Sequence, residues 1–313
     1  MIEVVQLTKR YGSTVAVRDL TFIVQPGFVT GFLGPNGSGK STTMRVILGL
    51  DAPTAGEARV GGRRYVDLRA PLREVGALLD TRAMHPGRTA YDHLLALARS
   101  NRIPQVRVDD VLGAVGLSDV ADRRVGGFSL GMSQRLGVAA ALLGDPGVLL
   151  FDEPVNGLDT EGIRWIRTLM KDLAAQGRTV FVSSHLMSEM ELTADRLVVI
   201  GRGRLIAEAT LAEFINTYSQ AVTLVRSTSA GQLGAALERA GASVALDPAG
   251  AWRVTGLDTA SVGELAAANG VVLHELRPLR SSLEDVYSQL TDTSVEYRAS
   301  ETSADPEPQE ALR

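Results

Sequence analysis

The sequence contains no cysteine and no long apolar run. Without cysteine the chain can form no disulfide, no thiolate nucleophile and no cysteine-ligated zinc site, which suits a reducing compartment. No uninterrupted apolar segment reaches the roughly 18 residues that a membrane-spanning helix needs. The start of the chain, MIEVVQLTKR, lacks the apolar core of a signal peptide. We therefore expect a soluble, cytoplasmic chain that reaches a membrane only through a partner.

An excess of positive charge is also missing. The net charge is −4 at pH 7 and the pI is about 5.7. This balance provides no overall basic surface for nucleic acid, and we expect no nucleic-acid partner. A length of 313 residues predicts roughly two domains of about 100–200 residues each. The hydrophobic content of 45% is enough for an ordinary globular core.

One glycine-rich stretch fits the phosphate-binding P-loop pattern G-x-x-x-x-G-K-[ST]. Its residues are Gly34, Pro35, Asn36, Gly37, Ser38, Gly39, Lys40, Ser41 and Thr42. The apolar run 28–33 predicts a buried strand before it, and 41–50 predicts a helix after it. Glycines let backbone N–H groups converge on a polyphosphate, and the helix N-terminus adds its positive dipole. Lys40 would contact the β- and γ-phosphates, and Ser41 would hold Mg²⁺.

Two carboxylates and a histidine follow predicted buried strands. The apolar strand 148–151 ends in Asp152 and Glu153, and the strand 179–182 is followed by His185. On a sheet that also carries a P-loop, Asp152 can hold Mg²⁺ through water and Glu153 can polarise an attacking water. The alternative is a strand end capped by solvated acids. A lone histidine is more often structural, but here it lies near the same crevice, where it can contact the γ-phosphate.

A serine precedes the strongly helical segment 133–144. Ser129 can cap this helix, and the N–H groups exposed at its start, near Gly131, can bind an anion. Considered alone, the segment fits an ordinary N-cap better than an anion site.

The order of elements predicts an α/β fold. Apolar strands alternate with helices up to about residue 215, which favours a mostly parallel sheet, and helices at 91–100 and 108–115 form a separate helical group. After residue 218 the pattern changes to β-α-β-β-α-β, typical of a small α+β domain, followed by a closing helix at 281–290. The acid-rich, polar segment 291–313 predicts a disordered tail.

Over roughly residues 1–215 the chain resembles the ATP-binding subunits of ABC transporters. Tyr11 matches the aromatic residue that stacks on adenine, and Gly34 to Thr42 match the Walker A motif. Ser129 and Gly131 match the signature motif, which is usually written LSGGQ. Asp152 matches the Walker B aspartate, Glu153 matches the general base, residues 156–159 match the D-loop and His185 matches the switch histidine. The resemblance implies a P-loop ABC ATPase core over 1–218, with a helical subdomain at about 88–140. An accessory α+β domain would occupy 219–290 and a tail 291–313.

Two departures from the family pattern are visible. Asp80 stands where the glutamine of the Q-loop is expected, and it could bind Mg²⁺ through water instead. In the signature, Leu130 replaces the first glycine and Met132 replaces the glutamine. Similar SLGM-type signatures, and a similar added C-terminal domain, occur in drug- and antibiotic-exporting ABC ATPases of the daunorubicin-resistance kind.

The resemblance implies a mechanism with two chains. Two copies, or two related chains, would face head to tail and sandwich ATP and Mg²⁺, each signature closing on the nucleotide of the other chain. Hydrolysis would drive a separate membrane permease, and the chain would lie on the inner face of the cell membrane. Alternatives are a soluble ABC ATPase acting on ribosomes or DNA, a P-loop GTPase, and a non-catalytic regulator. The first usually carries two cassettes or a long coiled coil, and the second a guanine-binding N-K-x-D motif; we find neither.

Overall fold

The computed structural model describes residues 1–80, 84–218, 222–227, 230–247, 250–279 and 282–292. A six-stranded sheet lies at the centre of residues 1–218. Its strands, in spatial order, are β5 (Val75–Leu78), β6 (Val148–Asp152), β7 (Thr179–Ser184), β3 (Val29–Leu33), β8 (Arg196–Gly201) and β9 (Arg204–Thr210). All neighbours are parallel except β8 and β9, which form an antiparallel hairpin. The predicted α/β fold is therefore confirmed.

The central strands are continuous apolar runs because both faces of the sheet are covered. Every residue of β3 and of β7 is buried, as expected for parallel strands packed on two sides. Leu33 pairs with Ser184, and Asp152 pairs with Ser183, so β3, β6 and β7 end at the same edge of the sheet. This edge positions the segments that follow these three strands.

A second sheet packs against one face of the central sheet. It has the order β2 (Thr14–Val24), β1 (Ile2–Tyr11), β4 (Ala55–Val60), and all its pairs are antiparallel. The helix α1 (Lys40–Ile47) contributes to the same core. Phe22 from this sheet contacts Phe32 and Phe181 of the central sheet, with ring centroids 5.6 and 5.8 Å away. Burial of these aromatic side chains fixes the two sheets together.

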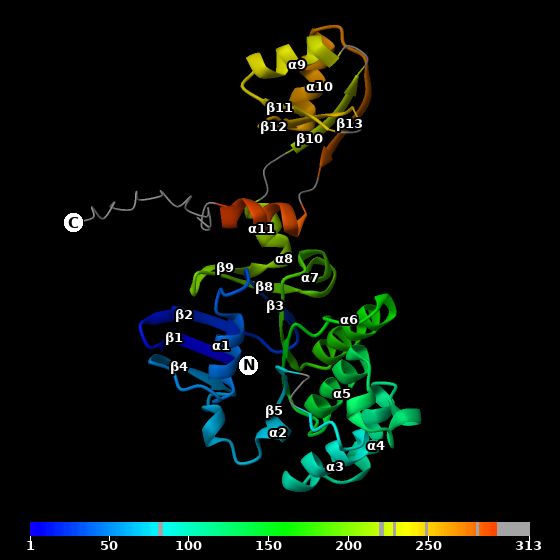
Figure 1. Ribbon diagram of the computed structural model, residues 1–313. Coiled ribbons are helices and arrows are strands. Elements are labelled where there is room, and N and C mark those ends of the chain that lie inside the picture. Colours follow the sequence, from blue (N-terminus) through cyan, green and yellow to red (C-terminus); the bar gives the residue numbers. More distant parts are fainter. Residues whose placement is uncertain (81–83, 219–221, 228–229, 248–249, 280–281, 293–313) are drawn as a thin grey trace, which may run out of the picture.

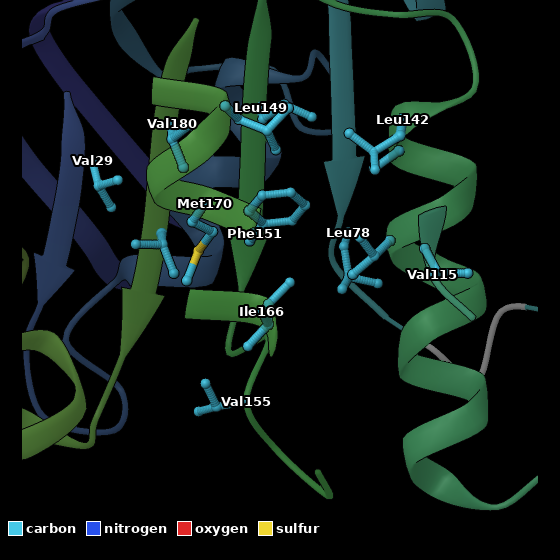
Figure 2. Close-up of a cluster of buried hydrophobic side chains, with 14 of the residues drawn as sticks. Val29, Leu78, Val115, Leu142, Leu149, Phe151, Val155, Ile166, Met170 and Val180 are labelled. Carbon is cyan, nitrogen blue, oxygen red and sulfur yellow. The ribbon is translucent and has the colours of Figure 1, made fainter. Parts of the chain in front are cut away.

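Helices cover the other face of the central sheet. α5 (Leu130–Leu142) lies near β5, and α6 (Thr160–Ala175) presents Ile166 and Met170 to the sheet (Figure 2). The predicted helical group contains α3 (Ala90–Ser100) and α4 (Val106–Ala114), which pack with α5. The remaining elements here are α2 (Pro71–Glu74), α7 (Met187–Thr193), α8 (Leu211–Tyr218) and the short 3₁₀ turns Tyr65–Asp67, Ser118–Val120 and Val125–Gly127. We did not predict α8, which packs beside β9.

The C-terminal unit has the predicted order of elements. They are β10 (Val222–Ser227), α9 (Ala230–Arg239), β11 (Ser243–Leu246), β12 (Trp252–Thr255), α10 (Thr259–Ala268) and β13 (Leu273–Leu279). The four strands form one antiparallel sheet in the order β11-β12-β10-β13. Val225 and Val254 are fully buried in a small core with residues of both helices.

The closing helix α11 (Leu283–Asp292) lies against the first unit, residues 1–218 (Figure 1). We expected the accessory domain to run to residue 290. However, Leu283 and Val286 are fully buried in the core cluster of the first unit, where α11 packs on α7 and α8. The Leu283 amide donates to Glu191 Oε2 at 3.0 Å. Helix α11 therefore packs with the first unit, because Leu283 and Val286 in its first half are covered there. Most of the predicted tail, residues 293–313, lies outside the described residues.

No helix of the described residues combines the length and the apolar character that crossing a membrane requires.

Candidate active site

The P-loop connects β3 to α1 and is held close to neighbouring backbone. A Cβ at Gly39, where φ is +103°, would lie 2.7 Å from the Ala16 carbonyl oxygen. A Cβ at Gly34 would lie 2.7 Å from the Ile200 carbonyl oxygen. Neither position can hold a larger residue without displacing backbone, so the glycines are required for the path of the loop. No side chain caps α1 at Gly39.

Lys40 begins α1 and is 7% exposed. Its Nζ donates to the carbonyl oxygens of Gly34 at 2.6 Å and Pro35 at 3.3 Å. Burial lowers the pKa of Lys40, while the carboxylates of Glu153 and Asp152 oppose this shift. The ammonium group therefore lies inside the loop and within electrostatic reach of both acids, as a phosphate-binding lysine should.

The loop has the chemistry of an anion site. The Ser38 hydroxyl is buried and has no hydrogen-bond partner among the described residues. A buried hydroxyl without a partner is costly, and a ligand oxygen would satisfy it. Together with the open start of α1 and the Lys40 ammonium, this fits a polyphosphate.

A magnesium ion would find hard oxygen ligands at the same edge. Ser41 lies exposed in the first turn of α1, and half-buried Asp152 ends β6. The Asp152 carboxylate accepts a hydrogen bond from the Ser183 hydroxyl. Within the described residues, no three or more His, Cys, Asp and Glu side chains gather as a metal site. In proteins Mg²⁺ commonly keeps one or two carboxylate ligands and takes the others from water and phosphate oxygens, which Ser41 and Asp152 would allow here.

Glu153 has a strained backbone. Its φ is +52°, a left-handed conformation that non-glycine residues rarely adopt. Its amide donates to the Ser183 hydroxyl at 3.0 Å and to the Ser183 carbonyl at 3.2 Å. Such strain is worth about 1–3 kcal/mol and concentrates at functional sites. Here it turns the chain sharply after β6 and leaves the Glu153 side chain only partly buried.

His185 contacts Glu153 directly. His185 Nδ1 lies 2.8 Å from Glu153 Oε2, and 45% of the histidine side chain is exposed. The strands β6 and β7 are neighbours, so the residues that follow them meet although they lie 32 positions apart in sequence. This contact holds the Glu153 carboxylate in one orientation and leaves part of the imidazole accessible.

Tyr11 lies at the end of β1, beside the start of α1. It is 47% exposed, and its hydroxyl donates to Asp51 Oδ2 at 2.8 Å. Lys9 Nζ lies 4.8 Å from its ring centroid. Desolvation and the Asp51 carboxylate raise the pKa of Tyr11, whereas a hydrogen bond with the Thr42 hydroxyl opposes the rise. The structure thus places this exposed aromatic ring next to the P-loop helix.

Asp80 shares a hollow with the two acids. A hollow of about 150 Å³ is lined by Leu78, Leu79, Asp80, Gln134, Asp152, Glu153 and Asn156. The departure from the family pattern therefore lies beside the candidate catalytic groups. Its role as a metal ligand stays a prediction.

Ser129 and Gly131 lie at the start of α5. The Ser129 hydroxyl accepts a hydrogen bond from the Met132 amide at 3.2 Å, so the predicted N-cap is present. Among the hydrogen bonds of the described residues, none joins Ser129 or Gly131 to the P-loop of the same chain. The P-loop, Asp152, Glu153 and His185 gather along the edge where β3, β6 and β7 end, whereas Tyr11 ends β1 of the second sheet and Asp80 follows β5.

Two residues that hold the catalytic side chains in place were not predicted from the sequence. Ser183 bridges Asp152 and the Glu153 amide. Gln134 is 4% exposed, and its Nε2 donates to the Pro154 carbonyl at 2.8 Å and the Glu153 carbonyl at 3.4 Å. The sequence features that could have indicated them are the hydroxyl of Ser183 at the end of a buried strand and the polar Gln134 on the buried face of a helix. Both are weak signals until the strands are paired.

Comparison with known proteins identifies the family. A model described as ABC transporter matches residues 17–156. The chain is 41% identical to the bacitracin transport ATP-binding protein BcrA of Bacillus licheniformis, over 66% of this chain and 69% of that protein. It is 33% identical to the BcrA of Enterococcus faecalis, over 93% and 96% of the two chains. The chain belongs to the ATP-binding subunits of ABC transporters.

Solved structures agree with this assignment. The dimeric structure of MJ0796, a bacterial ABC transporter cassette, is similar with a TM-score of 0.62 and 27% identity, covering 67% of this chain and 99% of that one. The post-hydrolysis state of MJ0796 with ADP and Pi gives a TM-score of 0.61 and 26% identity, over the same shares. The C-terminal unit of the ABC ATPase matches a domain of unknown function over residues 221–284. The predicted family, fold and activity, ATP hydrolysis coupled to transport, are confirmed.

Proposed function

We propose that this ABC ATPase powers the export of antibiotics or other hydrophobic compounds, with ATP enclosed between two chains. The observation that supports enclosure between two chains is that the predicted site residues of one chain lie in two separate places. The P-loop, the acids and His185 share one edge of the sheet, whereas the Ser129 helix start has no hydrogen bond to the P-loop of its own chain among the described residues. A second copy, or a related chain, would supply that helix start.

Within one chain, each side chain has a distinct task. The P-loop amides and Lys40 bind the β- and γ-phosphates, and Tyr11 stacks on adenine. Ser41, Asp152 and Asp80 are the candidate ligands for Mg²⁺, which when bound neutralises phosphate charge. Glu153 accepts a proton from the attacking water, and His185 orients Glu153 and contacts the γ-phosphate.

The second chain completes charge stabilisation. The start of its α5, with Ser129 and Gly131, would direct backbone N–H groups at the γ-phosphate. Positioned donors of this kind are worth about 10²–10³-fold in rate at other oxyanion sites. Loss of the γ-phosphate removes the group that both chains bind, so the two chains separate after hydrolysis.

The substrate class and the permease follow from the relatives. Similar proteins are named for bacitracin transport, lantibiotic transport and Nod factor export. We propose that a separate integral-membrane permease binds the exported compound, and that this chain acts at the inner face of the cell membrane.

The absence of cysteine provides a direct test of the sandwich. One preparation carries Asn36→Cys in the P-loop and a second carries Ser129→Cys, so an added bifunctional thiol reagent meets no other thiol. We expect cross-linking between the two preparations only with ATP, and no cross-link with ADP. A monomer by light scattering at saturating ATP, with no cross-link, would contradict the sandwich. Co-purification with ribosomes instead of membranes would favour the soluble alternative.

Asp80 tests the coupling to the permease. Asp80→Gln restores the residue that the family pattern expects. We expect ATP binding to stay intact and the stimulation of ATP hydrolysis by transported compound to change in reconstituted vesicles. Unchanged stimulation would make this departure neutral.

A further inference from the structure

The side chain of Leu130 occupies the space above Gly157. Leu130 is the first residue of α5 and is 55% exposed. A Cβ built on Gly157 would overlap the Leu130 Cγ and Cδ2 atoms and would lie 3.2 Å from the Leu130 Cβ. Gly157 also has a φ of +77°. A side chain at 157 would therefore displace the Leu130 side chain from the position that it holds here.

Gly157 belongs to the tight turn that follows Glu153. The Asn156 amide donates to the Glu153 carbonyl at 3.2 Å, and the Leu158 amide donates to the Val155 carbonyl at 3.2 Å. These two bonds fold residues 153–158 into a compact turn, in which Gly157 lies four residues after Glu153. A displacement of Gly157 would therefore fall within the same hydrogen-bonded turn as the strained Glu153 backbone.

The same helix holds this segment at a second point. Gln134, one turn after Leu130, donates to the carbonyl oxygens of Pro154 and Glu153. On the other side, Glu153 is anchored to Ser183. The start of α5 thus contacts the catalytic turn through one apolar contact and one buried amide.

We propose that Leu130 is a positioning residue, which through its seat on Gly157 joins the serine-tipped start of α5 to the turn that carries Glu153. This proposal rests on the two-chain site proposed above. In that arrangement the start of α5 acts on the nucleotide of the partner, whereas Glu153 acts on the nucleotide of its own chain. The matched pair Leu130 and Gly157 therefore couples the two nucleotide sites, and Leu130 itself need not touch either nucleotide.

A double-mutant cycle tests this pairing. Gly157→Ala inserts a methyl group into the Leu130 side chain, and we expect kcat to fall about tenfold or more. Leu130→Gly in the same chain removes every clashing atom, whereas Leu130→Ala leaves its Cβ 3.2 Å from the new methyl group. We expect full relief from Leu130→Gly and partial relief from Leu130→Ala. Alanine at 157 also strains the backbone because φ is positive there. This strain is the same whichever residue stands at 130, so it cancels in the double-mutant cycle.

Leu130→Gly alone tests the coupling. We expect a lower kcat and a loss of cooperativity in ATP, with the affinity of the single chain for ATP unchanged, and Leu130→Met should retain both properties. Val106→Gly is the matched control, because Val106 also begins a helix and is 60% exposed. It should leave kcat within about twofold.

Two outcomes would overturn the proposal. One is additive effects of Gly157→Ala and Leu130→Gly on both kcat and thermal unfolding. The other is a Leu130→Gly variant with unchanged kcat and cooperativity. If the unmodified chain binds ATP and never dimerises, the two-chain function fails and the coupling of sites fails with it. If the chain hydrolyses ATP and dimerises, but the effects of Gly157→Ala and Leu130→Gly simply add, the coupling proposal fails while the two-chain function stands.

Discussion

Two sheets of this protein, the central sheet of the cassette and the sheet of the C-terminal unit, differ in strand direction, and the placement of their polar residues differs accordingly. In the parallel sheet of the cassette, β3, β6 and β7 end at one edge, where Lys40, Asp152, Glu153 and His185 converge. In the antiparallel C-terminal sheet, neighbouring strands end at opposite edges. Parallel pairing concentrates chemistry at an edge, whereas antiparallel pairing disperses it.

In the C-terminal sheet, a glutamate pairs instead with one arginine on the neighbouring strand and with one on its own strand. Glu275 on β13 contacts Arg226 at 3.2 Å and Arg277 at 2.7 Å. These side chains are partly exposed, and ion pairs of this kind contribute about 0–1 kcal/mol. The cassette edge, by contrast, holds a buried lysine and a strained glutamate. Function and strain therefore coincide in the first unit of the chain.

The largest expected difference concerns one carboxylate from each sheet. Glu153→Gln removes the proton acceptor, and we expect kcat to fall about a hundredfold or more while ATP binding persists and a dimer accumulates. Glu275→Gln is the matched change in the other sheet and should leave kcat unchanged. Steady-state hydrolysis and light scattering measure both effects. Near-normal turnover of Glu153→Gln would remove Glu153 from the role of base.

Helix α11 is the next test of the division between the two units. Leu283→Ala deletes a fully buried side chain from the cassette core, and we expect it to destabilise that unit by about 2–5 kcal/mol. Val254→Ala, in the core of the C-terminal unit, should destabilise that unit alone. Hydrogen exchange resolved by peptide separates the two. If Leu283→Ala instead destabilises the C-terminal unit, α11 is part of the accessory domain.

A pair of buried hydroxyl groups sharpens the comparison further. Ser183→Ala removes the bridge between Asp152 and the Glu153 amide, and we expect kcat to fall about tenfold. The matched variant, Thr223→Ala, removes a hydrogen bond to the Leu257 carbonyl in the C-terminal unit. It should lower stability by about 1 kcal/mol without changing kcat. Equal kcat losses in both variants would mean that Ser183 acts only on folding.

The smallest effect concerns pH. Burial raises the pKa of Tyr287 on α11 to about 12, from 10.0 in an unfolded chain. The folded chain keeps this proton when the unfolded chain has lost it. Its stabilising contribution is therefore complete below pH 10 and is lost as pH rises from 10 to about 12. Between pH 9 and pH 11 we expect a loss of under about 1 kcal/mol, because solvent screens this partly buried group, and Tyr287→Phe should abolish it, as measured by urea unfolding. If Tyr287→Phe loses as much stability over this pH range as the unmodified chain, other groups cause the pH dependence.

The prediction from sequence succeeded where one local segment carries the signal. The P-loop with its flanking strand and helix, the acids after β6 and the N-cap at Ser129 each depend on residues close in sequence. The order of elements in the C-terminal unit was visible for the same reason. The helix α8 was missed, and the closing helix was grouped with the accessory domain although α11 packs on the cassette, because apolar periodicity does not say which core covers a helix.

The sequence alone determined the family, the fold class and the identity of the phosphate-binding loop, because those depend on short-range spacing. Only the tertiary structure decided that Ser183 bridges Asp152 and Glu153, that Gln134 holds the Glu153 turn, and that Leu130 fits Gly157. Each of these contacts joins segments 19 or more residues apart, such as the 19 between Gln134 and Glu153. Such pairings follow from strand register and helix packing, which are properties of the folded chain as a whole and not of any one segment.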